Sequence, residues 1–487
     1  MNNKKINESY KVKNLGQIFT PYPVVEFMLD CVGYKEEKML DKHLLDNSCG
    51  DGAFLVSAVQ RYVDFCKQNE MNESKIRNDL ETYIHGIEID FNAYERCLLN
   101  LNKIFKANYD IRNEDALDVS DYDEKMDFVI GNPPYVRIHN LNTRHKDFFF
   151  EKKIKGMQNL YLLFYLLSFR QLNKSGKFIY LTPSFFKNVS GNILRKKIID
   201  EKKALHFYDF KHQQIFPKIT TYPIISLFDN DCYSQNLQYS VVELACDNGE
   251  ENVNVISTTE YGWEKIYIDC RFIFDNYDFF DNYDFLKNDK KKYLEVKNGF
   301  ATLADNIFIS QKFPFESSNI IKVVKSSTGE NKECIFPYKY DLKKNKYELE
   351  DFLDLDKNVR DYLIKFRPQL EDRSIKEKDK WWQFGRTQAI NDLRKSRFYF
   401  NNLINEKFDN VELGFVSPNE GVYGGVYILL NEKFHEEEIK EIFQDDRFKM
   451  FVKIFGEHKS GNYYLINARL VEKYFNSIIS LRKGKSC

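Results

Sequence analysis

A polar loop follows a short apolar run near residue 130. The apolar residues at positions 128–130 predict a buried strand, which must end at the two consecutive prolines after Asn132, because proline cannot donate a ladder hydrogen bond. The loop presents the Asn132 amide, the Pro133 carbonyl and the Tyr135 ring at the carboxyl edge of a sheet, where open α/β sheets bind ligands. Two oxygen acceptors beside an aromatic ring can hold both protons of a planar amino group and favour the pyramidal nitrogen that an electrophile needs.

The same loop has a purely structural interpretation, in which a proline turn ends the strand and packs a tyrosine. Three acidic residues upstream favour the chemical interpretation. Asp46 ends one predicted strand, Glu88 lies near the end of the next, and Asp115 follows the third. We therefore expect all three carboxylates at the same edge as the loop, because parallel strands end together.

The acidic residues also indicate which ligand the edge would bind. The turn after Asp46 contains Gly50 and Gly52, which let the backbone approach a ligand closely. Carboxylates suit an amino group, ribose hydroxyls and an adenine amine, and they suit pyrophosphate poorly, so a dinucleotide is not expected. An amino acid end, a ribose and an adenine without phosphates describe S-adenosylmethionine.

The order of strands and helices through residue 230 predicts a doubly wound α/β sheet. Composition changes there, so we expect a first domain over residues 1–235, a connecting segment over 236–295 and a second, mixed α+β domain over 296–487. Residues 381–388 of the second domain interleave aromatic, cationic and amide side chains, including Arg386 and Gln388. Arginine and glutamine can bond bidentately to base edges, so we expect a recognition surface there, with ordinary β-domain packing as the alternative.

Two further segments have alternative interpretations. The basic helix expected over 192–199 carries Arg195 and Lys196, and such a face is either solvated or in contact with phosphate. Phe216, on a turn before Pro217, is either an exposed stacking face or part of the core. Near the amino terminus, Thr20 and Pro21 predict a helix N-cap.

Composition excludes several classes of protein. The 487 residues carry a formal net charge of −1, so a nucleic-acid partner requires a local basic patch. Nine cysteines without a Cys-x-x-Cys pair argue against a zinc site and fit a reducing cytoplasm. The longest apolar stretches are too short to cross a bilayer, so we expect no membrane partner.

Together these motifs resemble those of γ-class adenine-N6 DNA methyltransferases, the TaqI-like modification enzymes of Type II restriction–modification systems. The resemblance rests on residues 16–21, 45–54, 86–90, 115, 132–135, 159–161 and 215–217, in the order seen in that family. It covers the first half well, and the second half more weakly, at Gly299, 381–388 and 461–464. It implies a Rossmann-like methyltransferase domain followed by a target-recognition domain, and no nuclease fused before the cofactor motif.

The resemblance also implies roles for individual residues. Asn132 and the Pro133 carbonyl would hold the target amine, and Tyr135 and Phe216 would sandwich a flipped adenine. The residues expected to line the S-adenosylmethionine pocket are Thr20, Asp46, Ser48, Gly50, Glu88, Ile89, Asp115, Ala116 and Pro134. The residues expected to contact DNA are Arg195, Lys196, Trp382, Arg386 and Gln388.

The implied partner is double-stranded DNA, with a separately encoded restriction endonuclease as a further candidate; a monomer is expected. Relatives commonly carry Glu where this chain has Asp46, which keeps the charge but shortens the reach. An RNA adenine methyltransferase and a protein-glutamine methyltransferase share the same loop chemistry and remain alternatives. A DNA-binding subunit without activity is the non-enzyme alternative, and intact Asn132, Pro133 and Tyr135 argue against it.

Overall fold

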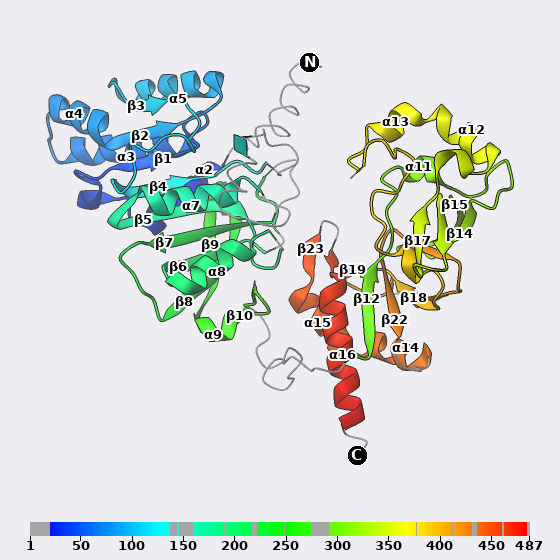
Figure 1. Ribbon diagram of the computed structural model, residues 1–487. Helices are drawn as coiled ribbons and strands as arrows, with labels where there is room; N and C mark the ends of the chain where they lie inside the picture. The colour runs from blue at the N-terminus through cyan, green and yellow to red at the C-terminus, as the bar shows by residue number, and fades with distance from the viewer. Residues whose placement is uncertain are drawn as a thin grey trace. The chain divides into compact units, whose positions relative to one another are not determined.

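The computed structural model describes most of the chain, in two units. The described residues are 20–136, 144–145, 159–188, 190–211, 213–216, 222–247, 249–274, 292–375, 377–410, 413–430, 436–459 and 462–484. The first unit is Met1–Phe274 and the second is Asp275–Cys487 (Figure 1). Residues 16–19, Pro217 and Gly461, which belong to the predicted motifs, lie outside the described ranges.

The first unit is built on a nine-stranded sheet with the order β3-β2-β1-β4-β5-β7-β6-β8-β9. The strands are β1 Leu44–Asp46, β2 Ile84–Ile87, β3 Asp110–Arg112, β4 Met126–Gly131, β5 Leu172–Pro183, β6 Ala204–Asp209, β7 Pro223–Asp229, β8 Asn236–Asp247 and β9 Glu250–Gly262. Strands β3, β2, β1, β4 and β5 are parallel, and β7 is antiparallel to both of its neighbours. The strand order reverses between β1 and β4, which is where ligands bind in such sheets.

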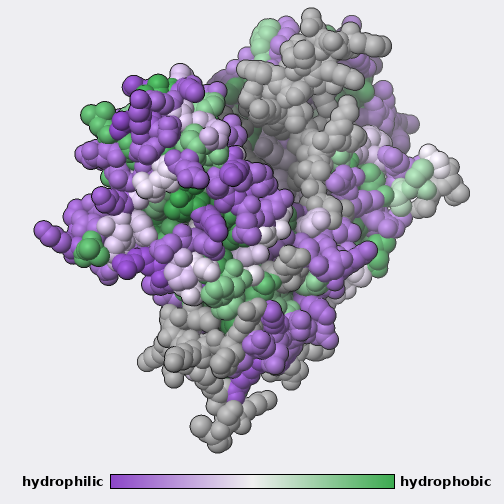
Figure 2. Space-filling view, turned by 90° about the vertical axis from the view of Figure 1, so that its right-hand side faces the viewer, coloured by the Kyte–Doolittle hydropathy of each residue, from purple (hydrophilic) through white to green (hydrophobic). Residues whose placement is uncertain are grey.

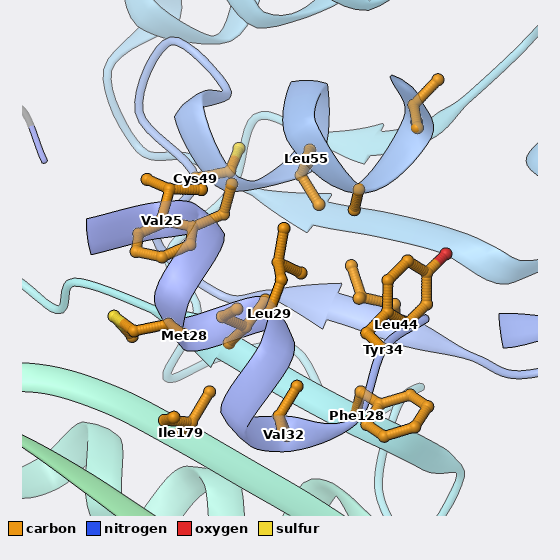
Figure 3. Packing of buried hydrophobic residues seen from close by; sticks show 14 of the residues in the cluster. Val25, Met28, Leu29, Val32, Tyr34, Leu44, Cys49, Leu55, Phe128 and Ile179 are labelled. Atoms are coloured by element: carbon orange, nitrogen blue, oxygen red, sulfur yellow. The ribbon is translucent and has the colours of Figure 1, made fainter. Parts of the chain in front are cut away.

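Helices cover both faces of this sheet. They are α2 Tyr22–Val32, α3 Ala53–Gln68, α4 Glu73–Tyr83, α5 Phe91–Ile104, α7 Tyr161–Gln171, α8 Asn192–Glu201 and the short α9 Trp263–Ile266. Residues on α2 point toward Leu44, Phe128 and Ile179 of the strands (Figure 3). On the other face, the Tyr165 ring of α7 contacts the rings of Phe178 and Tyr180 at centroid distances of 5.8 and 5.4 Å. The second half of β5 is buried on both faces, and its residues 178–181 accordingly form a continuous apolar run.

Helix α2 forms because its apolar residues fall on one face. Val24, Val25, Met28 and Leu29 are all buried, at helical spacing. The helix ends at Gly33, whose φ of 85° lies in the left-handed region that favours glycine. The N-cap is Pro21 without a side-chain cap, so the predicted Thr20 cap is wrong and the Thr20 hydroxyl is available for another contact.

The doubly wound α/β prediction is confirmed, and one predicted boundary is wrong. Residues 236–262 were expected to begin a connecting segment, yet they form β8 and β9, which pair with each other and extend the sheet beyond β6. Two short strands, β10 Tyr267–Ile268 and β11 Arg271–Phe272, follow before the unit ends at Phe274. The first unit is therefore larger than its composition indicated, because polar residues dominate β9.

The second unit mixes small sheets with helices, as predicted. One sheet has the order β12-β22-β18-β20 and another has β13-β15-β14-β21. Their strands are β12 Leu294–Asn298, β13 Ile309–Ser310, β14 Ile320–Lys325, β15 Asn331–Ile335, β18 Arg397–Phe400, β20 Leu413–Val416, β21 Gly421–Tyr423 and β22 Val426–Leu430. The β16 Tyr338–Asp341 and β17 Lys346–Leu349 hairpin and the β19 Leu403–Asn405, β24 Tyr463–Leu465 and β23 Glu457–Lys459 sheet complete the strands described for this unit.

Helices of the second unit pack against these sheets. They are α11 Asp305–Phe308, α12 Lys357–Lys365, α13 Arg367–Glu371, α14 Glu436–Gln444, α15 Asp446–Phe455 and α16 Ala468–Gly484. The Asn476 side chain of α16 accepts the backbone N–H groups of Tyr293 and Leu294 at 2.6 and 3.1 Å, which joins the helix to the start of β12. Hydrophilic residues dominate the face shown in Figure 2, with smaller hydrophobic groups between them. Of the helices described, none combines the length and apolar character that crossing a bilayer requires.

Candidate active site

The predicted cofactor residues come together at the carboxyl edge of the sheet. Asp46 is the last residue of β1, Glu88 directly follows β2, and Asn132 directly follows β4. These three strands are neighbours, in the order β2-β1-β4, and all are parallel. Asp115 follows β3 by three residues. The edge therefore presents four polar side chains from four adjacent strands around the point where the strand order reverses.

Two backbone N–H groups hold the Glu88 carboxylate, one from the turn after β1 and one from the residues after β2. The Gly50 N–H donates to Glu88 Oε2 at 2.9 Å, and the Asp90 N–H donates to Glu88 Oε1 at 2.7 Å. Gly50 has a φ of 57°, in the left-handed region, which turns its N–H toward the carboxylate. Each carboxylate oxygen can accept a second hydrogen bond, so Glu88 is oriented by the protein and still able to accept from a ligand.

Asp46 is a buried carboxylate whose charge is poorly compensated. It is 1% exposed, and the Ser48 N–H donates to its Oδ1 at 3.0 Å. Burial raises the pKa of Asp46 to about 8; the Ser48 amide opposes this effect and nearby Glu88 adds to it. A cationic ligand group beside Asp46 would stabilise its ionised form. This site therefore suits the ammonium group of an amino acid end.

Ser48 is a second residue of this turn whose chemistry suits a polar ligand. Its hydroxyl oxygen is buried and has no hydrogen-bond partner within the part of the chain that the structure describes. Buried hydroxyls are normally satisfied by protein, water or ligand. A polar group at the buried Ser48 hydroxyl, a cation at Asp46 and hydroxyls at Glu88 are the chemistry of S-adenosylmethionine, so the residues present fit that cofactor.

Asp115 has a partner that the sequence did not reveal. Its Oδ1 accepts the Leu117 N–H at 3.1 Å, and its Oδ2 lies 2.6 Å from Nε2 of the buried His145. Burial raises the pKa of Asp115, but His145 and the Leu117 amide outweigh burial and lower it overall. Asp115 is therefore an ionised acceptor near neutral pH. His145 belongs to none of the motifs that the sequence analysis singled out.

The remaining cofactor candidates surround these carboxylates. Ile89, two residues after β2, is 53% exposed, whereas Ala116 is buried beside Asp115 in the sequence. The Asn113 amide, which the sequence analysis did not assign, donates to the Glu88 and Ile89 carbonyls at 2.8 and 3.2 Å. These bonds join the segments that follow β2 and β3. They hold the apolar Ile89 next to the carboxylates at the edge of the sheet.

The Asn132 side chain is oriented by Thr20, the residue that was predicted to cap α2. Its Nδ2 donates to Thr20 Oγ1 at 3.1 Å. Because an amide has its donor and acceptor on opposite branches, fixing Nδ2 also fixes where Oδ1 points. Farther along the loop, the Tyr135 hydroxyl donates to the Leu181 carbonyl at 3.1 Å, and the Leu160 N–H donates to the Val136 carbonyl at 2.8 Å. Pro133 is buried and Pro134 is half-buried, so residues 132–136 of the loop are anchored.

The predicted aromatic sandwich is not formed in this geometry. Phe216 is 2% exposed and belongs to the core of the first unit. Its ring meets the half-buried Tyr135 ring edge-on, with centroids 6.4 Å apart and an interplanar angle of 70°. Two parallel faces about 7 Å apart are needed to hold a base between them. The expectation of an exposed Phe216 is therefore wrong, and its core interpretation holds.

The predicted DNA contact at Arg195 is wrong as well. Arg195 is 2% exposed, its Nε donates to the Cys270 carbonyl at 2.6 Å, and another nitrogen donates to the Phe185 carbonyl. Burial and nearby Arg271 lower the pKa of Arg195 to about 10. This guanidinium joins α8 to two backbone segments and cannot reach a phosphate. Lys196, the next residue, is exposed.

The recognition candidates of the second unit divide in the same way. The Trp382 indole N–H donates to the Glu350 carbonyl at 3.0 Å, and its ring packs on Phe352. Trp382 is therefore a packing residue, against the prediction. Arg386 exchanges backbone hydrogen bonds with Ala301, so its backbone is fixed. The side chains of Arg386 and Gln388 are both exposed and stay candidates for base contact.

Comparisons with known proteins agree with this geometry. The family described as N-6 DNA Methylase matches residues 6–229. The chain is 29% identical over 250 residues to the Type II methyltransferase M.BstVI of Geobacillus stearothermophilus, which covers 46% of this chain and 44% of that protein. It is 21% identical over 542 residues to the Type II restriction enzyme and methyltransferase RM.Eco57I of Escherichia coli, covering 90% of this chain and 54% of that protein.

A solved structure of the Type IIL restriction-modification enzyme MmeI in complex with DNA has a similar fold. The TM-score is 0.64 at 13% identity, and the match covers 93% of this chain and 65% of that chain. The chain spans about half the length of the curated relatives that it matches. Residues 6–229, which include the asparagine–proline loop at the switch point, match the family described as N-6 DNA Methylase over a little less than half of the chain.

Proposed function

We propose that the chain is an adenine-specific DNA methyltransferase of the γ class. It would transfer a methyl group from S-adenosylmethionine to the exocyclic N6 amine of an adenine flipped out of duplex DNA. The supporting observation is how close the acceptor loop lies to the cofactor turn. Asn132 follows Gly131, and a Cβ built on Gly131 would lie only 2.8 Å from Asp46 Oδ1. A donor held at Asp46 is thus next to an amine held at Asn132.

The cofactor would lie along the carboxyl edge. Its amino acid end would meet Asp46, Ser48 and Thr20, and its ribose hydroxyls would meet Glu88. Asp115, oriented by His145, would accept a hydrogen bond from its adenine. Ile89 and Ala116 would contact the adenine ring, and Gly50 and Pro134 would complete the lining of the pocket. When bound, S-adenosylmethionine supplies an electrophilic methyl on a positively charged sulfur.

The chain's own residues would prepare the target amine. Asn132 Oδ1 and the Pro133 carbonyl would each accept a hydrogen bond from one N–H of the amine, and Thr20 keeps the amide from rotating. Holding both protons favours a pyramidal nitrogen whose lone pair points away from the acceptors, toward the methyl. The N6 nitrogen would bond to the methyl as the carbon–sulfur bond breaks, the neutral thioether would leave, and the methylated amine would lose one proton to solvent. This displacement needs no nucleophilic side chain and no covalent intermediate with the protein, and the anchored loop supplies orientation in advance.

Tyr135 would provide the stacking face for the extruded base. Extrusion costs a few kcal/mol, which stacking on an aromatic ring can offset. Phe216 would act behind Tyr135, through the edge-on contact that keeps the Tyr135 ring in place. Burial raises the pKa of Tyr135, so its hydroxyl stays a neutral donor to Leu181.

Sequence recognition is assigned to the second unit, through Arg386 and Gln388, with Lys196 of the first unit as a phosphate contact. The substrate would be double-stranded DNA, and the chain would modify its site within a restriction–modification system. RM.Eco57I combines restriction and modification, as its name states. A separately encoded endonuclease and a monomeric state remain predictions.

A methyl-transfer assay tests the proposal. The purified protein is incubated with radiolabelled S-adenosylmethionine and matched duplex DNA, RNA or a bacterial protein extract, and digested DNA is examined for N6-methyladenine. We expect label in DNA only, at adenine. Label confined to RNA or to glutamine side chains would establish one of the alternatives instead, and N4-methylcytosine in the digest would contradict adenine specificity.

A further inference from the structure

Four buried polar side chains form a hydrogen-bond network beside the cofactor turn, in which Gln171 Nε2 has no partner among the described residues. They are Asn47 of the turn, Ser168 and Gln171 of α7, and Tyr180 of β5, none more than 1% exposed. Buried polar groups are costly unless satisfied, so a network of this kind needs a reason. None of the four was a predicted site residue, and none touches the target amine or the proposed cofactor in the roles described above.

The donors and acceptors of this network can be assigned. The Tyr180 hydroxyl donates to Asn47 Oδ1 at 2.7 Å, and Asn47 Nδ2 donates to Gln171 Oε1 at 2.9 Å and Ser168 Oγ at 3.3 Å. Since the only proton of the Tyr180 hydroxyl is used, the Ser168 hydroxyl must donate across the 2.5 Å contact to Tyr180. Asn47 is therefore held by three hydrogen bonds from two elements.

Tyr180 also lies against the acceptor loop. It stands opposite Gly131 in the β4–β5 register. A Cβ built on Gly131 would be 3.6 Å from a Tyr180 ring carbon and 2.8 Å from Asp46 Oδ1. The space beside Gly131 is thus filled by Tyr180 and by the carboxylate of the residue before Asn47. One side chain contacts the strand that carries Asn132 and holds the turn that carries Asp46 and Ser48.

We infer that Tyr180, acting through Asn47, is a positioning residue that sets the separation between the methyl donor and the target amine. This inference rests on the proposed function. The Tyr180 ring packs against Gly131, while its hydroxyl fixes Asn47 and with it the two neighbouring cofactor contacts. Removing the hydroxyl leaves Asn47 Oδ1 without its donor in a buried site, and the turn must shift or hydrate to satisfy it.

Tyr165 provides a matched control. It is equally buried, and its ring lies 5.4 Å from that of Tyr180 on the same face of the sheet. Its hydroxyl also bonds to two side chains, Ser226 at 2.6 Å and Thr182 at 3.0 Å, but neither belongs to the cofactor turn. Tyr180→Phe and Tyr165→Phe therefore remove the same chemical group from similar surroundings, and only one loss reaches Asn47.

The experiment compares Tyr180→Phe, Tyr165→Phe and Ser168→Ala in the full chain. Calorimetry gives the affinity for S-adenosylmethionine and for its demethylated product, thermal unfolding gives stability, and single-turnover methylation at saturating cofactor gives the transfer rate. We expect both Tyr variants to lose stability. Only Tyr180→Phe should also lose cofactor affinity and transfer rate, each about tenfold, the order expected for a buried acceptor left unsatisfied. Ser168→Ala should fall between the two.

Wild-type affinity and transfer rate in Tyr180→Phe would overturn the inference, as would equal losses in Tyr165→Phe, which would show that any packing defect has this effect. If Tyr180→Phe fails to fold, the Ser168→Ala comparison with Tyr165→Phe decides in the same way. A wild-type protein that binds cofactor but methylates only RNA would overturn the DNA assignment and leave the positioning role standing. A wild-type protein that binds no cofactor would overturn both.

Discussion

Replacing Thr20 with valine removes one hydrogen bond from the asparagine proposed to hold the target amine. Valine keeps the β-branched shape of threonine and lacks the oxygen that accepts from Asn132 Nδ2 at 3.1 Å. A neutral hydrogen bond of this kind contributes about 0.5–1.5 kcal/mol, so freeing the amide should slow methyl transfer by about 2- to 12-fold. Thr20→Ser keeps the hydroxyl and should transfer methyl at a rate within about twofold of wild type, the loss expected from a weakened rather than absent bond.

The assay must separate this effect from cofactor binding, because Thr20 is also a predicted cofactor contact. Cofactor affinity is measured first for each variant, and single-turnover methylation of duplex DNA is then followed at saturating cofactor. The expected pattern is a slower transfer rate in Thr20→Val that added cofactor does not restore. A Thr20→Val enzyme as fast as wild type, or a Thr20→Ser enzyme as slow as Thr20→Val, would refute the orienting role.

Three further perturbations follow from the structure. The pKa of Asp46 is raised to about 8 in the folded protein, whereas the unfolded chain releases this proton near pH 3.8. The stability of the cofactor-free protein, compared with that of Asp46→Asn, should therefore fall as pH rises from about 4 to about 8 and then level off. Thermal unfolding at a series of pH values measures this difference. Cofactor affinity should rise over the upper part of this window in wild type and stay flat in Asp46→Asn. Arg195→Ala should cost about 2 kcal/mol or more in chemical denaturation, because the buried Phe185 carbonyl and the part-buried Cys270 carbonyl lose their donor. Lys196→Ala should leave stability unchanged and weaken DNA binding. Weaker DNA binding by a stable Arg195→Ala protein would contradict the buried role of Arg195. Arg386→Ala or Gln388→Ala should relax sequence preference by about 1–3 kcal/mol in competition binding, and an unchanged preference in both would exclude them from base readout.

The sequence predicted the residues at the carboxyl edge of the sheet better than it predicted the side chains that orient them. Short strands followed by Asp46, Glu88 and Asn132 were recognisable because strand, turn and helix signals alternate regularly there. His145 was missed because its contact with Asp115 joins residues 30 apart in the sequence, and no motif includes it. Contacts of this kind depend on tertiary placement, which local patterns do not carry.

The wrong assignments have physical causes. Arg195 lies three residues before Ile198 and next to Leu194, both buried, so it falls on the inner face of α8 while Lys196 faces outward. The prediction treated the basic residues of this helix as one group and did not consider which face of the helix each one occupies. Strand β9 was missed because it is an edge strand exposed along most of its length, which removes the apolar alternation that identifies strands.

The central claim is that Asn132 holds the target amine beside a methyl donor bound at Asp46, Ser48 and Glu88. Its most direct test measures cofactor binding and single-turnover methylation on one preparation of Asn132→Ala. The account predicts wild-type cofactor affinity with transfer slowed by about 10²-fold or more, the scale observed when one preorganised hydrogen-bonding group is removed from an active site. Methylation by this variant at the wild-type rate would contradict the account.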